Sequence, residues 1–87
     1  SGYNLEQNYP NPFNPSTQIN FSVPMNGFVT IKVFDIMGRE VNTLVSAELN
    51  PGKYSTDFNS AGLSSGIYFY SLYANGFSET KKMILTK

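Results

Sequence analysis

The chain has 87 residues and a formal net charge of zero, with 40% hydrophobic, 15% aromatic and only 14% charged residues. This composition is too apolar for a disordered chain, fits one small domain, and gives no basic excess for binding nucleic acid or an anionic membrane. The absence of cysteine excludes a disulfide framework and a thiolate zinc site. No apolar run approaches the roughly 20 residues of a membrane helix, and no signal peptide is present. We therefore expect a terminal domain excised from a longer protein, in which residues 1–7 are the end of a linker and Ser1-Gly2 a cloning remnant.

The proline segment, residues 8–15, reads Asn-Tyr-Pro-Asn-Pro-Phe-Asn-Pro and contains three of the five prolines. Because each proline fixes its own φ and lacks an N–H, this segment is neither a helix nor a central strand. It nevertheless carries Tyr9 and Phe13, two large rings that a solvated linker does not need. We expect both rings to anchor the segment on the domain, with Asn11 and Asn14 closing Asx turns ahead of the prolines that follow them.

Alternating hydrophobic residues predict strands, not helices, along the rest of the chain. The predicted strands span Gln18–Val23, Phe28–Asp35, Glu40–Val45, Lys53–Phe58, Ile67–Ala74 and Phe77–Lys87. Turns are predicted at Pro24–Gly27, Ile36–Arg39, Asn50–Gly52 and Asn75–Gly76. Short strands at such intervals predict an all-β fold, a seven-stranded antiparallel immunoglobulin-like β-sandwich. The register of the last strand stays open, because Met83, Ile84 and Leu85 are consecutive apolar residues.

The start of the penultimate predicted strand, Gly66-Ile67-Tyr68, adds a specific signal. In immunoglobulin-like sandwiches a tyrosine at this place turns its hydroxyl back onto upstream backbone. Tyr70, two positions later, is then expected to face the core. The simpler interpretation is that Tyr68 is one more core aromatic, and its role is structural in either case.

The titratable residues form no recognisable catalytic or metal site. Histidine and cysteine, the commonest catalytic base and the thiolate nucleophile, are absent. Asp35 and Asp57 flank turns, where aspartate usually binds local backbone. A calcium site at Asp57 and Asn59 would lack the dense acidic alternation of recognised calcium loops. We therefore expect no enzymatic activity, no metal and no cofactor.

An alternative function is carbohydrate binding or adhesion, as an appendage of a surface enzyme. Small β-sandwiches with exposed aromatic rings often bind sugars, although tryptophan is absent here. Aromatic residues within strands more often pack against their cross-strand neighbours, which is the simpler interpretation. The candidate rings are Phe28, Phe34, Phe69, Tyr73 and Phe77.

Four motifs that occur in order resemble those of one family. They are the proline segment, an Asp-x-x-Gly-Arg-x-Val hairpin, a Leu-x-x-Gly-x-Tyr segment and a lysine-flanked hydrophobic tail. The residues that carry them are Tyr9, Pro10, Pro12, Phe13 and Pro15, then Asp35, Gly38, Arg39 and Val41, then Leu63, Gly66 and Tyr68, and finally Lys81–Lys87. Over nearly its whole length the chain resembles the type A C-terminal sorting domain of proteins exported by the type IX secretion system of Bacteroidetes and related Gram-negative bacteria.

The resemblance implies that residues 8–87 are a non-enzymatic sorting signal at the C-terminus of a cargo protein. Its partner would be the outer-membrane secretion machinery, its destination the cell surface or the medium, and nucleic acid would play no part. In many members of the family a sortase removes the domain and joins the cargo to surface lipopolysaccharide. A similar module occurs in flagellar hook-capping proteins, so the fold alone does not fix the role.

Two groups of residues are candidates for recognition by that machinery. Arg39 either projects for recognition or pairs with Asp35 or Glu40, and recognition is favoured because an exposed pair adds little stability. The second group is a positive patch near the C-terminus, which serves recognition or protects an edge strand from aggregation, two roles left equally open. This patch consists of Lys81, Lys82 and Lys87.

Overall fold

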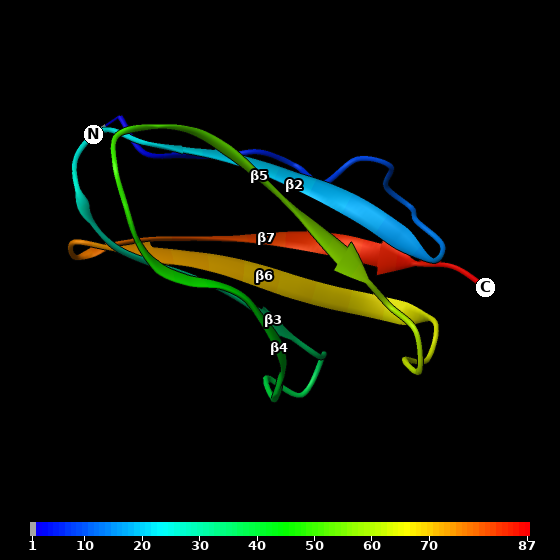
Figure 1. Ribbon diagram of the computed structural model, residues 1–87. Helices are drawn as coiled ribbons and strands as arrows, with labels where there is room; N and C mark the ends of the chain where they lie inside the picture. The colour runs from blue at the N-terminus through cyan, green and yellow to red at the C-terminus, as the bar shows by residue number, and fades with distance from the viewer. Residues whose placement is uncertain (1) are drawn as a thin grey trace.

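A computed structural model describes residues 2–87. Seven strands and no helix occur in these residues: β1 (Asn4–Leu5), β2 (Ser16–Val23), β3 (Gly27–Phe34), β4 (Glu40–Leu49), β5 (Gly52–Asn59), β6 (Gly66–Ala74) and β7 (Phe77–Leu85). One sheet has the order β1-β2-β5 and the other the order β4-β3-β6-β7, with antiparallel pairing between all neighbours. The two sheets form the two layers of Figure 1, so the predicted antiparallel β-sandwich is confirmed.

The fourth strand distinguishes this sandwich from an antibody constant domain. There the fourth strand belongs to the sheet of the first two strands. Here β4 instead pairs with β3, which gives a sheet of four strands opposite a sheet of three. β4 and β5 are consequently edge strands of different sheets.

The core lies between the sheets and follows the alternation seen in the sequence. In β3 the predicted inward residues, Val29, Ile31 and Val33, are all buried. In β7 Met83 and Leu85 are buried while Ile84 is 36% exposed, which settles the register that the sequence left open. Successive side chains of a strand point to opposite faces, so one face of each sheet supplies the core.

β4 is four residues longer than predicted, ending at Leu49 instead of Val45. Its pairing with β3 shifts register between Ile31 and Lys32 and again between Val33 and Phe34. Each shift leaves one extra residue on β4, Leu44 and Val41, and both pack against the core. These bulges interrupt the two-residue alternation on which the sequence prediction relied.

The short β1 strand was not predicted. Leu5 is only 1% exposed and pairs with Phe21 of β2, and the ring of Tyr3 stacks on Phe77 with centroids 4.8 Å apart. A strand of two residues has no alternation to read, so periodicity could not reveal it. Where the linker ends stays a prediction, but the packed part of the chain begins before residue 8.

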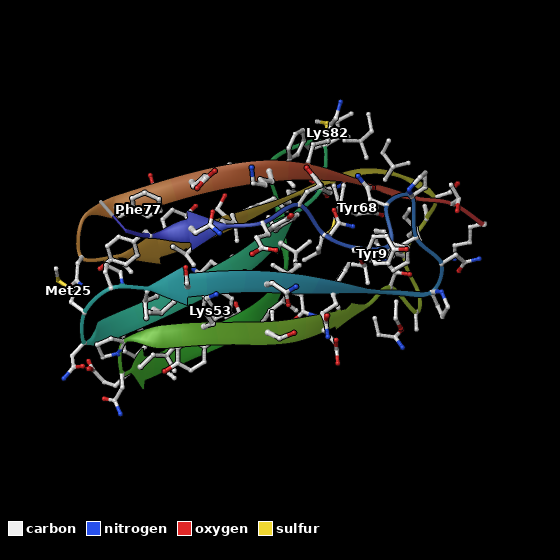
Figure 2. All side chains as sticks on the ribbon, turned by 90° about the horizontal axis from the view of Figure 1, so that it is seen from above. Tyr9, Met25, Lys53, Tyr68, Phe77 and Lys82 are labelled. Atoms are coloured by element: carbon white, nitrogen blue, oxygen red, sulfur yellow. The ribbon has the colours of Figure 1, made fainter. Side chains whose placement is uncertain are left out.

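Residues 3–13, here called the N-terminal segment, lie between the edges of β2 and β7 (Figure 2). On the β2 side, Tyr9 and Gln18 exchange backbone hydrogen bonds, each 2.9 Å long. On the β7 side, the N–H of Phe13 donates to the carbonyl of Ile84 at 2.9 Å. The amide of Gln7 donates to the carbonyl of Lys82 at 2.7 Å. The segment thus closes one open side of the sandwich.

The hydroxyl of Tyr70 ties this segment to the interior. It donates to the carbonyl of Glu6 at 2.7 Å and accepts from the N–H of Asn8 at 2.8 Å. Tyr70 lies in β6, is fully buried as predicted, and burial raises its pKa to about 12. The phenol therefore stays protonated and able to donate at neutral pH.

Tyr68 makes the contact expected of a tyrosine corner. Its hydroxyl donates to the carbonyl of Ser64, four residues upstream, at 2.7 Å. Gly66, at the start of β6, lies between the two residues. The bond fixes the loop between β5 and β6 against the strand that follows it.

Replacing Tyr70 by phenylalanine tests the tie between segment and core. The Tyr70→Phe protein should lose about 1–3 kcal/mol of unfolding free energy, because the buried N–H of Asn8 and the carbonyl of Glu6 lose their partner together. Urea unfolding measures the loss. The matched control is Tyr73→Phe in the same strand, where the ring is 41% exposed and little change is expected. Equal stability of the two variants would contradict the role given to Tyr70.

Candidate recognition surface

The proline segment is held by Phe13 and Asn8, and not by Tyr9. Phe13 is 1% exposed, as expected of an anchor, and its ring meets the ring of Phe58 edge-on with centroids 6.0 Å apart. Tyr9, however, is 81% exposed, so the expectation that its ring anchors the segment is wrong. The bonds that hold Tyr9 come from its backbone, paired with Gln18. In extended backbone neighbouring side chains point in opposite directions, and here the inward direction belongs to Asn8.

Asn8 is buried because it satisfies several polar groups at once. Its side-chain amide donates to the hydroxyl of Thr17 at 3.0 Å and to the carbonyl of Pro10 at 3.1 Å. Its side-chain oxygen accepts from Gln7 at 2.7 Å. A buried polar side chain with all its groups bonded carries little penalty and can fix the path of a segment that has few N–H groups of its own.

The Asx turns predicted at Asn11 and Asn14 do not form in the described residues. The side-chain oxygen of Asn11 accepts from the N–H of Ile84, 73 residues away, at 3.0 Å. Within residues 2–87, Asn14 makes no side-chain hydrogen bond to the residues after it. Asn11 therefore pairs with the edge of β7, where it occupies a donor that would otherwise face solvent.

The hairpin between β3 and β4 is organised by Asp35. One of its carboxylate oxygens accepts from the backbone N–H of Met37 at 2.9 Å and of Arg39 at 3.0 Å. The other accepts from Nε of Arg39 at 2.9 Å. Gly38 has φ +84°, a conformation that glycine adopts without strain, and its N–H bonds the carbonyl of Asp35. The motif residues Asp35 and Gly38 thus build the loop itself.

The sequence left open whether Arg39 pairs with a nearby acid or projects into solvent, and in the structure it does both. It pairs with Asp35, as described, and it is also 76% exposed. The pairing uses Nε alone, and in the described residues no partner is recorded for the two terminal nitrogens. The carboxylate thereby binds the guanidinium through Nε and leaves its two terminal nitrogens available to a partner. Val41, two residues further on, packs against the core.

The structure divides the predicted lysine patch. Lys81 lies on the same side of β7 as the core residues, where it pairs with Glu79 at 3.3 Å. Lys82 points to the opposite, outer face and is exposed, as Figure 2 shows at the edge of the molecule. Lys87 lies beyond the end of β7 and is also exposed. Adjacent residues of a strand cannot share a face, so the three lysines do not form one compact patch.

Two exposed residues of this hairpin were read from sequence only as parts of a turn. Ile36 and Met37 are 67% and 75% exposed. Beside them is a hollow of about 340 Å³ between the hairpin and the loop that enters β6, with Ile67 and Tyr68 on its far side. The signal that could have found them was present: two large apolar residues stand at the tip of a turn, where polar residues are usual.

The candidate rings for carbohydrate binding lie mostly on β3 and β6, where Phe34 pairs with Phe69 across the strands. Phe28 and Tyr73 are 51% and 41% exposed, whereas Phe77 stacks on Tyr3. Asn59 accepts from the N–H of Ala61 in a local turn. Within residues 2–87 there is no group of three or more acidic residues placed to hold a metal ion, and no helix long and apolar enough to span a membrane.

The chain matches a known protein family over nearly its whole length. Residues 7–86 match the model of the secretion system C-terminal sorting domain. The chain belongs to this family. No curated protein and no solved structure matches the chain.

The family gives the domain its role. As a type IX secretion sorting domain, it is the C-terminal signal that marks a cargo protein for export, is recognised by the secretion machinery, and has its cargo on the N-terminal side. Export leads to the cell surface or to secretion. The sorting domains of this family are themselves non-catalytic, and no comparison supports the carbohydrate-binding alternative.

The Asp35 carboxylate predicts a pH dependence of stability. The backbone N–H of Arg39 is the main cause that holds the pKa of Asp35 below its ordinary value of 3.8, with further help from the Arg39 side chain and the N–H of Met37. A pKa lowered by folding stabilises the protein above the unfolded value, and this stability is lost as pH falls through the folded value. Asp35→Asn should therefore melt below the unchanged protein at pH 7, and the difference should shrink below pH 3.8.

Thermal unfolding across pH measures that difference. Glu40, whose pKa is lowered by the hydroxyl of Thr43 and by Lys32, titrates in both proteins and cancels from the comparison. A gap in melting temperature that stays constant down to strongly acid pH would show that the charge of Asp35 does not act in the hairpin.

Proposed function

We propose that the secretion machinery reads the sorting domain mainly at the end of the sandwich where the β3–β4 hairpin and the end of β7 lie. Arg39, Lys82 and Lys87 carry exposed positive charge at this end, and Lys81 supports the strand edge through its pair with Glu79. The observation that carries the proposal is that Arg39 is exposed and pairs with Asp35 through Nε alone, because stability gives such an exposed guanidinium little purpose.

The remaining motif residues have structural roles in this proposal. Phe13 and the prolines Pro10, Pro12 and Pro15 hold the N-terminal segment in place, while Asp35, Gly38 and Val41 set the hairpin. Gly66 and Tyr68 fix the loop before β6. Residues 1–7 connect to the cargo, and a sortase in a competent host then cuts on that side and joins the cargo to the cell surface.

Removing the whole lysine tail would be a poor test of this proposal. The tail Lys81–Lys87 includes Met83 and Leu85, which are 0% and 1% exposed. Its deletion would remove core side chains that typically contribute about 2–5 kcal/mol each, so a loss of export could follow from unfolding alone. Charge-removing substitutions at exposed positions avoid this difficulty.

A passenger protein fused in front of this chain should be exported by a host that has a type IX system. Replacing Lys82 and Lys87 by glutamine should lower export several-fold, because rim charges speed the encounter with an oppositely charged partner. Fractionation and immunoblotting of the passenger measure export. The matched control is Lys53→Gln on the other sheet, which removes an exposed charge elsewhere.

Three results would separate the possibilities. Export of the fusion and of the Lys53 control, but not of the double variant, supports the lysines as recognition groups. Undiminished export of the double variant would assign them to edge protection instead. A fusion that is not exported at all, in a host that exports its own cargo, would count against the sorting role in this chain.

A further inference from the structure

The tip of the β3–β4 hairpin presents two apolar side chains that folding does not require. Ile36 and Met37 are adjacent, exposed, and belong to no part of the core. The loop beneath them is held by hydrogen bonds that the backbone N–H groups of residues 37 to 39 donate to oxygen atoms of Asp35. The tip therefore keeps both side chains projecting outward instead of letting them fold back onto the sheet.

The apolar area continues from the tip onto the outer face of the neighbouring strands. Ile67 of β6 is 37% exposed and lies across the hollow from the hairpin. Its cross-strand partner in β7 is Ile84, which is 36% exposed on the same face. We call Ile36, Met37, Ile67 and Ile84, with the hollow between the hairpin and Ile67, the hairpin-tip surface.

Positive charge surrounds this surface and its acids are neutralised. Arg39 and Lys82 are exposed beside it, and Lys82 precedes Ile84 by two positions on the outer face of β7. Asp35 is bonded to Arg39, and Glu40 pairs with Lys32 at 3.2 Å. Arg39 and Lys32 thus balance these two acids, while the exposed Lys82 makes no ion pair within residues 2–87 and adds net positive charge beside the surface.

The opposite end of the sandwich differs in charge. It also exposes large apolar side chains, Met25 and Phe28, at 52% and 51%. The residue paired with Phe28 across the strands is however Glu48, and Lys53 near this end lies on the other sheet. Figure 2 shows Met25 at the far end of the molecule from Tyr68, which lines the hollow. The opposite end thus has an acid directly across from its exposed ring, whereas the acids at the hairpin-tip surface are paired with cations.

We propose that the hairpin-tip surface docks on an anionic membrane surface. Ile36 and Met37 enter the boundary between headgroups and acyl chains, while Arg39 and Lys82 contact lipid phosphates. A projecting apolar tip with cations around its base fits a soft headgroup layer, because insertion needs no matching surface. A stable protein complex instead buries on the order of 1,000 Å² or more over complementary faces, which a narrow tip does not offer. The proposal does not depend on the proposed recognition of Arg39 and the lysines by the machinery.

Vesicle binding by the unchanged 87-residue chain tests the proposal. The chain should co-sediment with phosphatidylcholine vesicles that contain about 30% phosphatidylglycerol, and much less with pure phosphatidylcholine. Raising the salt from about 0.1 M to about 1 M should release it, because surface charges are then screened. Replacing Ile36 and Met37 by serine should lower the partition coefficient about tenfold or more, as both side chains lose apolar area buried in the lipid. Lys82→Gln should lower it about fivefold.

The matched control is Met25→Ser at the opposite end, which should bind as the unchanged chain does. All variants change exposed residues, and their melting temperatures verify that they remain folded. Loss of binding in the tip variant but not in Met25→Ser supports the proposal. It is overturned if the unchanged chain ignores anionic vesicles, or if the two variants lose binding equally. In the first case the hairpin-tip surface would be left for a protein partner.

Discussion

The buried hydroxyl of Tyr70 is the interaction on which the arrangement of this domain depends. A phenol without partners is costly in a core, and here both partners are backbone groups of the N-terminal segment, Glu6 and Asn8. The hydroxyl and the two backbone groups satisfy one another's hydrogen-bonding capacity. The segment is therefore held in place on the side where the sandwich would otherwise be open. The polypeptide that joins the cargo to the domain therefore enters along a defined path between β2 and β7.

Closure of this side has a consequence for the edge of β7. An open strand edge invites pairing with other chains, a hazard for a protein that must remain unaggregated during export. Asn11 and Phe13 cover the last residues of the strand, and Gln7 caps the carbonyl of Lys82. With the edge protected by the N-terminal segment, the charged residues of β7 are not needed for that purpose alone. This favours a recognition role for Lys82 over edge protection.

The sequence predicted what depends on short-range patterns and missed what depends on distant partners. Alternation identified the inward residues of β3, and Asn75-Gly76 forms the predicted tight turn with φ of 49° and 79°. The order of the two sheets, the long β4 and the short β1 depend on contacts across the fold. Tyr9 was assigned to the core because large rings usually are buried. Asn8 occupies the inward position instead, because its side chain bonds residues such as Thr17 that a local sequence pattern does not identify as its partners. The prediction of a compact lysine patch was wrong for a simpler reason. The register of β7 could not be determined from the sequence, so the face on which each lysine lies could not be determined either.

The hairpin motif Asp-x-x-Gly-Arg-x-Val divides its work between fixed and open positions. Asp35 and Gly38 shape the loop, and Asp35 also orients Arg39. The two open positions, Ile36 and Met37, are the ones that the loop displays to solvent. A scaffold that depends on backbone hydrogen bonds tolerates any side chain at its tip. The family pattern can therefore specify the shape of the hairpin while leaving its surface chemistry to the individual protein. In this chain the two open positions are apolar and stand beside the cation of the motif, and neither folding nor the motif requires apolar side chains there.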